Sequence, residues 1–440
     1  MKILSIGYYD DFARFYLEIK KEFKKKDTQV QFKYLSLYLS GYLYFLVRLQ
    51  DVSFFSFKVW MNIFFNKSKY RNIIKENKVY KGIDLDKIIK YHLLLDREEK
   101  INLKLQAVSY INTVEALLLK FQPDVIILSG DSRMSIEILN LKAKELNIET
   151  YYFEQGPFGT TIFDREGVNA HASLREKELN SLNNDKMAEK EQNIKNFFAR
   201  KRYSKYNRYP FYRGLDYIFQ YICSFLGLLP VDIKMEKRAD VCLSEYKNLS
   251  YDLHHKDKKI FLLILQVPYD VNMVYHSPFF RNHFDIVKNV YKNLPVNSHL
   301  LVREHPLYKG RYENELYRFM LVNNISLNTE DLYKSIDKAD VIIVNNSTVG
   351  IEAISKEKTV VVLGDAYYDN DLICLKLKNE KNLDKLLEKG LQYKPQKEYI
   401  ISFLDNFLNY YLINGHFRDS NLVAPQIITN QILKQGEKNV

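Results

Sequence analysis

The chain has 440 residues, which is more than one hydrophobic core usually organises, so two domains are expected. Hydrophobic residues make up 46% and charged residues 27%, which excludes a disordered chain, and 15 Gly with 10 Pro argue against a Gly-rich all-β protein. The net charge of +11 suits nucleic acid, anionic lipid or a phosphorylated small molecule, without choosing among them.

The cysteine pattern and the lack of long apolar runs indicate the compartment. Cys223, Cys242 and Cys374 are widely spaced, which fits neither a zinc site nor a disulfide framework and favours a reducing compartment. The N-terminus runs into Asp10 and Asp11, so it is typical of a first strand rather than a signal peptide. No window holds the roughly 20 uninterrupted apolar residues of a spanning helix. We expect a cytoplasmic protein that rests on a membrane surface at most.

The first part of the chain alternates strand-like and helix-like segments. Pro123 separates an amphipathic helix from an apolar strand that ends in polar residues, which is typical of a parallel α/β sheet. The expected strands are 2–7, 30–34, 124–131 and 149–153, and the expected helices are 8–26, 101–121 and 134–146, with aromatic-rich helices within 38–65.

The middle of the chain changes character. Residues 173–214 are polar and end in a basic-aromatic run at 197–214, and residues 216–229 are apolar at helical spacing. This predicts a helical insertion at about 173–257 within an N-terminal domain of residues 1–257. A C-terminal domain at 258–400 and a helical segment at 401–440 complete the prediction.

The α/β pattern resumes at residue 259. The expected strands are 260–265, 299–302, 341–344 and 359–363, and the expected helices are 282–294, 312–323, 350–355 and 403–413. The predicted fold class is therefore α/β, with two Rossmann-like domains facing a cleft. Ligands of such sheets bind beyond the carboxyl ends of strands, where we find Asp131, Glu154, Asp270, His305 and residues 345–348.

Residues 345–350 follow a strand and open a helix. Asn346, Ser347, Thr348 and Gly350 offer hydroxyls and backbone N–H groups to an anion, and Glu352 in the first turn suits ribose hydroxyls. An ordinary helix cap with an acidic first turn explains the same residues.

His305 lies in an Arg303-Glu-His-Pro306 segment just after a strand. Pro306 fixes the turn, so His305 can hydrogen-bond a phosphate and protonate it as it leaves, while Arg303 adds positive charge. A structural histidine in a turn is the competing interpretation.

Two carboxylates, one from each predicted domain, suit a double displacement. Glu154 ends a strand and precedes Gln155 and Gly156, and Asp270 follows the first strand of the second half. Such a pair supplies a nucleophile and a general acid/base for glycosyl transfer with retention. Chance motifs and solvated loop carboxylates are the alternative.

The basic-aromatic run suits either nucleic acid or anionic lipid head groups, and a plain solvated face is the third interpretation. Its cations are Arg200, Lys201, Arg202, Lys205, Arg208 and Arg213. The sequence contains no GxxxxGK[ST] loop and no HExxH motif, and we expect neither an NTPase nor a metal site.

Taken together, these segments resemble the capsule polysaccharide biosynthesis family, specifically its KpsS/LipB-type branch of β-Kdo (3-deoxy-D-manno-octulosonic acid) transferases. The resemblance covers roughly residues 120–420 and rests on the order of the segments at 153–171, 265–278, 303–310, 345–353, 361–369 and 412–418. The EQG, HP and ST steps are also similar to bacterial sialyltransferases, which use a related CMP-linked donor. The first 120 residues carry no resemblance.

The resemblance implies a GT-B fold and transfer of Kdo from CMP-β-Kdo with retention, without a cofactor or metal. The acceptor would be a phosphatidylglycerol-type lipid at the inner face of the bacterial inner membrane, beside other capsule assembly enzymes. By the resemblance Glu154 is the acid/base, Asp270 the nucleophile, His305 with Ser347 and Thr348 the phosphate site, and Glu352 the ribose contact. Further expected sugar or acceptor contacts are Asp131, Gln155, Asp164, Asn169, Gln266 and His276.

Two alternatives stay open on the sequence alone. One keeps the CMP site and changes the sugar to sialic acid or another 2-keto acid. The other is a nucleic-acid-binding or scaffold protein that uses the basic-aromatic run; the transferase interpretation expects no nucleic acid partner.

Overall fold

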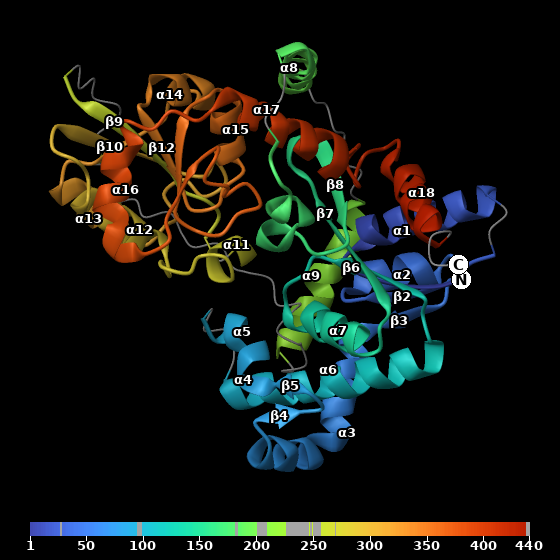
Figure 1. Cartoon of the computed structure of the whole chain (residues 1–440). Helices are drawn as coiled ribbons and strands as arrows, with labels where there is room; N and C mark the ends of the chain where they lie inside the picture. The colour runs from blue at the N-terminus through green and yellow to red at the C-terminus, as the bar shows by residue number, and fades with distance from the viewer. Residues whose placement is uncertain are drawn as a thin grey trace. The chain divides into compact units, whose positions relative to one another are not determined.

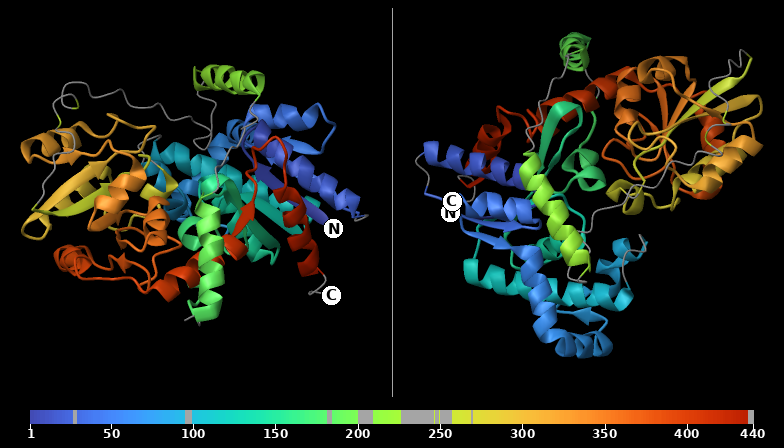
Figure 2. Two further views of the ribbon diagram at one scale, coloured as in Figure 1. Left: turned by 90° about the horizontal axis from the view of Figure 1, so that it is seen from above. Right: turned by 180° about the vertical axis from the view of Figure 1, so that it is seen from behind.

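The computed structural model describes residues 1–26, 29–94, 99–180, 184–199, 209–225, 246, 249, 257–268 and 270–436. Its contacts divide the chain into two compact units, whose strands and helices are labelled in Figure 1 and shown from two further sides in Figure 2. Unit 1 comprises residues 1–168, 201–235 and 409–440, and unit 2 comprises residues 169–200 and 236–408.

Unit 1 is built on a seven-stranded sheet of order β15-β8-β7-β6-β1-β2-β3. The five strands from β7 to β3 run parallel, and β8 and β15 extend the sheet in antiparallel fashion. The strands are β1 (Lys2–Gly7), β2 (Gln31–Ser36), β3 (Val52–Phe54), β6 (Val125–Ser129), β7 (Glu149–Gln155), β8 (Thr160–Asp164) and β15 (Leu412–Asn414).

Aromatic side chains dominate the core of unit 1. The Phe153 ring stacks on Phe15 with centroids 4.7 Å apart and meets Phe417 edge-on at 5.3 Å, so the last part of the chain closes the core of the first. The helices of unit 1 are α1 (Asp10–Lys25), α2 (Leu39–Leu46), α3 (Phe55–Glu76), α4 (Leu85–Ile88), α5 (Lys90–Leu94), α6 (Lys100–Phe121), α7 (Met134–Glu145), α9 (Pro210–Phe225) and α18 (Ala424–Gly436), with a small hairpin of β4 (Val79–Tyr80) and β5 (Ile83–Asp84).

Unit 2 contains a six-stranded, fully parallel sheet of order β11-β10-β9-β12-β13-β14. Numbered along the chain this order is 3-2-1-4-5-6, which is that of a doubly wound Rossmann sheet. The strands are β9 (Lys259–Ile264), β10 (Ser298–Arg303), β11 (Ser326–Leu327), β12 (Val341–Val344), β13 (Thr359–Val362) and β14 (Leu375–Lys376). β12 and β13 are short β-branched runs buried along their whole length, as expected for strands covered on both faces.

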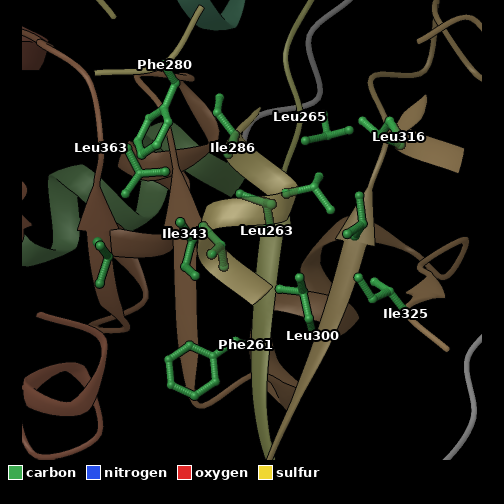
Figure 3. Close-up of a cluster of buried hydrophobic side chains, with 14 of the residues drawn as sticks. Phe261, Leu263, Leu265, Phe280, Ile286, Leu300, Leu316, Ile325, Ile343 and Leu363 are labelled. Carbon is green, nitrogen blue, oxygen red and sulfur yellow. The ribbon is translucent and has the colours of Figure 1, made fainter. Parts of the chain in front are cut away.

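One continuous apolar core holds the sheet and helices of unit 2 together. Phe261, Leu263 and Ile343 project from the central strands, and Ile286 and Leu316 meet them from the helices (Figure 3). The helices are α8 (Asn184–Ala199), α11 (Val271–Val274), α12 (His283–Lys292), α13 (Asn314–Val322), α14 (Leu332–Lys338), α15 (Val349–Ser355), α16 (Leu383–Gly390) and α17 (Lys397–Asn406).

The α/β class with two Rossmann-like parts is confirmed, but the contacts group the chain differently from the predicted domain limits. Residues 169–200, predicted as part of the N-terminal domain, group with unit 2, where Arg175 forms ion pairs with Asp365 and Asp369. Residues 409–440 return to unit 1. The predicted helix at 403–413 ends early, because residues 412–414 pair with β8 as a strand.

The helical insertion is present where it is described, as α8 and α9. None of the described helices is both long and apolar enough to cross a bilayer.

Candidate active site

A cavity of about 160 Å³ lies at the switch point of the unit 2 sheet. β9 and β12 are neighbours there, while the chain leaves β9 toward β10 and leaves β12 toward β13 on the other side. The loops after them therefore diverge and leave a crevice at the carboxyl ends of the strands. Seven predicted site residues line it, namely Asn169, Gln266, Asp270, His305, Asn346, Ser347 and Thr348.

The Tyr312 hydroxyl joins the ends of β9 and β10. The backbone N–H of His305 donates to Tyr312 Oη at 3.0 Å, and the same hydroxyl donates to the carbonyl of Gln266 at 3.0 Å. Tyr312 is buried, so both bonds are shielded from water. The two segments that carry His305 and Gln266 are thereby fixed relative to each other.

A buried carboxylate, Glu304, closes the turn that presents His305. Its Oε1 accepts the Tyr317 hydroxyl at 2.5 Å and the Gly310 N–H at 2.9 Å, and its Oε2 accepts the Tyr246 hydroxyl at 3.0 Å. Burial raises the pKa of Glu304, and these three hydrogen bonds partly offset that rise. Glu304 therefore has a structural role in the turn.

His305 is held as a neutral hydrogen-bond donor. Its Nδ1 accepts the N–H of Leu307 at 3.3 Å, so the proton of the neutral ring sits on Nε2. Burial lowers the pKa of His305 below its usual value, which keeps the ring neutral at pH 7. A neutral Nε2–H suits a hydrogen bond to an anionic oxygen better than it suits proton transfer.

Two buried amide side chains of the cavity wall have hydrogen-bonding atoms without partners. Gln266 is 7% exposed, and neither its Oε1 nor its Nε2 has a protein partner. Asn346, also 7% exposed, donates from Nδ2 to the carbonyls of Asn272 and His276 at 2.8 and 3.0 Å, but its Oδ1 has no partner. Buried polar groups are normally paired, so these atoms are available to hydrogen-bond a molecule that enters the cavity.

Ser347 and Gly350 shape the turn after β12. Ser347 Oγ accepts the N–H of Val349 at 3.3 Å, and the Ser347 carbonyl accepts the Tyr368 hydroxyl. A Cβ on Gly350 would lie 2.6–2.8 Å from the Tyr368 ring and hydroxyl, which real contacts do not allow. Gly350 is thus required for packing and does not line the cavity, and neither does Glu352.

A network of four charges stands behind one wall of the cavity. Asp365, which lines it, accepts Lys376 Nζ at 2.9 Å and Arg175 Nη2 at 3.3 Å, and both cations also contact Asp369. Burial acts to raise the pKa of Asp365, but Lys376 and Arg175 outweigh it and hold that pKa below its usual value. Asp365 is therefore ionised, and Lys376 and Arg175 balance its negative charge.

Arg303 does not supply charge to the cavity, contrary to the prediction. Its Nη1 donates to Asn328 Oδ1 at 2.6 Å and to the Glu330 carbonyl at 2.5 Å, which ties β10 to the segment after β11. The described residues that line the cavity include no lysine and no arginine. Pro306 and His276 flank lining residues without lining the cavity themselves.

The remaining predicted polar residues belong to unit 1. Glu154 lies near the end of β7, where its Oε1 accepts the Gln155 N–H at 2.9 Å. Asp131 accepts the Val168 N–H at 3.0 Å and Asp164 accepts the Glu166 N–H at 2.8 Å, so both organise the loop after β8. Gln155 Oε1 accepts from Arg418 at 3.4 Å.

Of the predicted lipid-binding cations, Arg200, Lys201, Arg202, Lys205 and Arg208 lie outside the described residues. The Arg213 guanidinium lies 4.0 Å from the centroid of the Tyr9 ring and 3.7 Å from Asp216, which is buried. Its charge is directed at the interior of unit 1.

Sequence reasoning missed three polar residues of the cavity, Asn272, Asp365 and Tyr367. Asp365 had a usable signal, because it follows the strand at 359–362 just as Asp270 follows the strand at 259–264. Asn272 and Tyr367 lie within the resemblance segments at 265–278 and 361–369, but no strand ends directly before either of them to single them out.

The structure is that of an α/β protein with two Rossmann-like units and a polar cavity at the switch point of the second. The chain belongs to the capsule polysaccharide biosynthesis protein family, whose model matches residues 124–418. The predicted family is thereby confirmed, over a range that includes the whole of unit 2, which contains the cavity.

Individual relatives are similar to this chain over a smaller part of its length or at low sequence identity. Protein FixF of Sinorhizobium fredii is 30% identical over 177 residues, which are 38% of this chain and 40% of FixF, so the chain spans well under two thirds of that relative. Two solved chains of Thermosulfurimonas dismutans KpsC are similar. The β-Kdo 2,7 transferase is 16% identical with a TM-score of 0.41, covering 80% of this chain and 95% of its own. The β-Kdo 2,4 transferase is 15% identical with a TM-score of 0.39, covering 71% and 87%.

Acid should lower the free energy of unfolding through His283, whose ring packs against Tyr312 beside the cavity. The ring centroids are 5.0 Å apart, and burial lowers the pKa of His283 from 6.5 to about 3. Because the unfolded chain binds a proton at His283 below pH 6.5 and the folded chain does not, the free energy of unfolding falls as pH drops from 6.5 toward 3. The loss is about 1.4 kcal/mol per pH unit, or about 2 kcal/mol at pH 5.

We expect His283→Leu to remove that part of the acid sensitivity. Urea unfolding of both proteins at pH 7 and pH 5 measures it: the drop between the two pH values should be about 2 kcal/mol smaller in the variant. An equal drop in the two proteins would show that His283 is not the group that titrates.

Proposed function

We propose that this protein is a GT-B glycosyltransferase that moves Kdo from CMP-β-Kdo to a phosphatidylglycerol-type lipid, with retention, in the synthesis of a capsular polysaccharide linker. The observation that carries the proposal is the switch-point cavity, with its two unpaired buried amides, in a chain of a capsule biosynthesis family. The work of the protein would take place at the inner face of the bacterial inner membrane, beside other capsule assembly enzymes.

The groups in the cavity suit the donor's chemistry. CMP-β-Kdo presents phosphate oxygens, a sugar carboxylate and several hydroxyls. His305 Nε2–H and the hydroxyls of Ser347 and Thr348 would bind the phosphate by hydrogen bonds, since no lysine or arginine is among the described lining residues. Gln266 and Asn346 would pair with groups that offer both donors and acceptors, such as sugar hydroxyls or the edge of cytosine.

In the first step Asp270 would act as the nucleophile. Its carboxylate attacks the anomeric carbon of Kdo, a C–O bond to Asp270 forms, and the bond from the anomeric carbon to the phosphate oxygen breaks. CMP leaves with that electron pair, and the neutral donors at His305, Ser347 and Thr348 stabilise its phosphate without giving up a proton.

In the second step the lipid hydroxyl would replace Asp270. A general base accepts the proton of that hydroxyl, the oxygen attacks the anomeric carbon, and the bond to Asp270 breaks. By the family resemblance, Glu154 would be that base. Two inversions give net retention. Asp365 is an unsuitable nucleophile in this scheme because Lys376 and Arg175 already hold its carboxylate.

The reaction itself is the first test. A fluorescent phosphatidylglycerol analogue is offered with CMP-Kdo generated in situ or with CMP-sialic acid, and the lipid product is weighed by mass spectrometry. We expect a product heavier by one Kdo from the first donor alone. A sialylated product would show that the donor sugar is sialic acid and not Kdo. Absence of any product, from folded protein that binds CMP, would contradict the proposed lipid acceptor.

Asp270→Asn should separate binding from chemistry. The amide keeps the size of the carboxylate but is a poor nucleophile, so we expect transfer to fall about 10³-fold or more while CMP affinity by calorimetry stays within about threefold. Asp371→Asn, at an exposed aspartate of the same unit, is the matched control and should leave both unchanged. Transfer at the normal rate in Asp270→Asn would assign the nucleophile elsewhere.

Gln266→Leu should weaken donor binding without destabilising the fold. The native amide is buried and unpaired, so an apolar side chain of similar size removes a desolvation cost, and the free energy of unfolding should stay level or rise by about 1 kcal/mol. Loss of two hydrogen bonds to the donor should weaken its affinity by about 10- to 30-fold. Gln192→Leu on exposed α8 is the control, and a loss of stability with unchanged affinity would make Gln266 a structural residue.

A further inference from the structure

Helix α9 of unit 1 has one apolar side exposed. Six large side chains lie on it, with Phe225 86% and Tyr221 78% exposed. The spacing of Phe211, Ile218, Ile222 and Phe225 places them along one stripe of the helix, whereas Asp216 and Cys223 on the opposite stripe are buried. An exposed apolar stripe of this size is uncommon on a soluble surface and marks an interaction site.

An aromatic ladder joins this stripe to helix α3. Phe219 on α9 meets Phe54 with centroids 5.4 Å apart, and Phe54 stacks on Phe57 at 6.0 Å. The row continues along α3 through Trp60, Phe64 and Phe65 at spacings of 5.9, 5.7 and 5.3 Å. Phe64 and Phe65 are 64% and 72% exposed.

The two helices also adjoin in space. Figure 2, right, shows α9 and α3 near each other in unit 1, and Phe219 of α9 contacts Phe54, the last residue of β3, which directly precedes α3. We call the exposed side chains of this side, on α9 and α3 together, the aromatic face.

The charge beside the aromatic face is positive. From Phe55 to Lys75, α3 contains no acidic residue, and its cations Lys58, Lys67, Lys69, Arg71 and Lys75 are all exposed. Aromatic and aliphatic side chains flanked by lysine and arginine are the composition that binds the interface of an anionic bilayer, where rings enter the head-group boundary and cations meet lipid phosphates.

We propose that the aromatic face docks unit 1 on an anionic lipid bilayer. The charge complementarity selects this occupant over a second copy of the chain, because two copies would bring five exposed cations on each α3 together. The proposal concerns a different surface from the basic-aromatic run at 197–214, most of whose cations lie outside the described residues. It does not rest on the transfer reaction, since binding to vesicles needs neither donor nor acceptor turnover.

Vesicle co-sedimentation of the full chain tests the proposal. We expect binding to vesicles of phosphatidylcholine with phosphatidylglycerol and much weaker binding to phosphatidylcholine alone. Phe64→Ser with Phe65→Ser, and separately Tyr221→Ser with Phe225→Ser, should each weaken binding by about tenfold or more. Lys67→Gln with Lys69→Gln should weaken binding only where phosphatidylglycerol is present, by about fivefold per charge.

Val296→Ser with Val322→Ser, at exposed valines of unit 2, is the matched control and should bind like the wild type. Circular dichroism melting checks that each variant is folded, and ultracentrifugation gives its oligomeric state. No vesicle binding by the wild type, or equal binding by all variants, would overturn the proposal. A wild-type dimer that the aromatic variants dissociate would assign the face to a second copy instead.

Discussion

One buried hydroxyl holds the candidate site of unit 2 in shape. Parallel strands bring their carboxyl ends to one edge of a sheet, but they do not fix the loops that follow. Tyr312 does so here, because its hydroxyl accepts from the backbone of His305 and donates to the backbone of Gln266. The two bonds use main-chain atoms, so both side chains stay directed by the fold and available to a ligand. Glu304 and His283 act on the same element, one by closing the turn and one by packing on the Tyr312 ring.

The cations near the cavity pair with other protein groups and do not line the cavity. An anionic ligand is usually met by lysine or arginine, yet Arg303 is committed to Asn328, and Arg175 with Lys376 is committed to Asp365 and Asp369. The donor side chains among the described lining residues are neutral: one imidazole, three hydroxyls and four amides. Neutral donors bind an anion less tightly than cations do, and they also release it more easily. For a proposed reaction in which a nucleoside monophosphate must depart, that balance favours turnover.

Much of the fold could be predicted, because the strands are encoded by short stretches of neighbouring residues. The strands at 260–265, 341–344 and 359–363 are short runs of branched apolar residues beside turn-forming residues, a pattern that favours buried parallel strands. Because site residues follow those strands directly, Gln266, Asp270, His305 and residues 346–348 could be placed as well. The membership of residues 169–200 could not, since it depends on ion pairs between Arg175 and residues almost 200 positions away. The position of Arg303 could not be predicted for the same reason, because its partner Asn328 lies in the segment after β11, 25 positions away in the sequence.

The unpaired amides of Gln266 and Asn346 could not be predicted from the sequence, because no sequence pattern shows that a buried side chain will lack a hydrogen-bond partner. Leaving a buried amide unsatisfied costs about 1–3 kcal/mol, against a net stability of about 5–15 kcal/mol for a typical domain. Leucine at position 266 would avoid that cost and would match the apolar strand before it. A buried glutamine without a protein partner, at the switch point of a Rossmann sheet, is explained when a ligand supplies the missing hydrogen bonds. The same reasoning applies to the aromatic face. Exposed rings lower the solubility of a protein, and a partner surface that covers them removes this disadvantage.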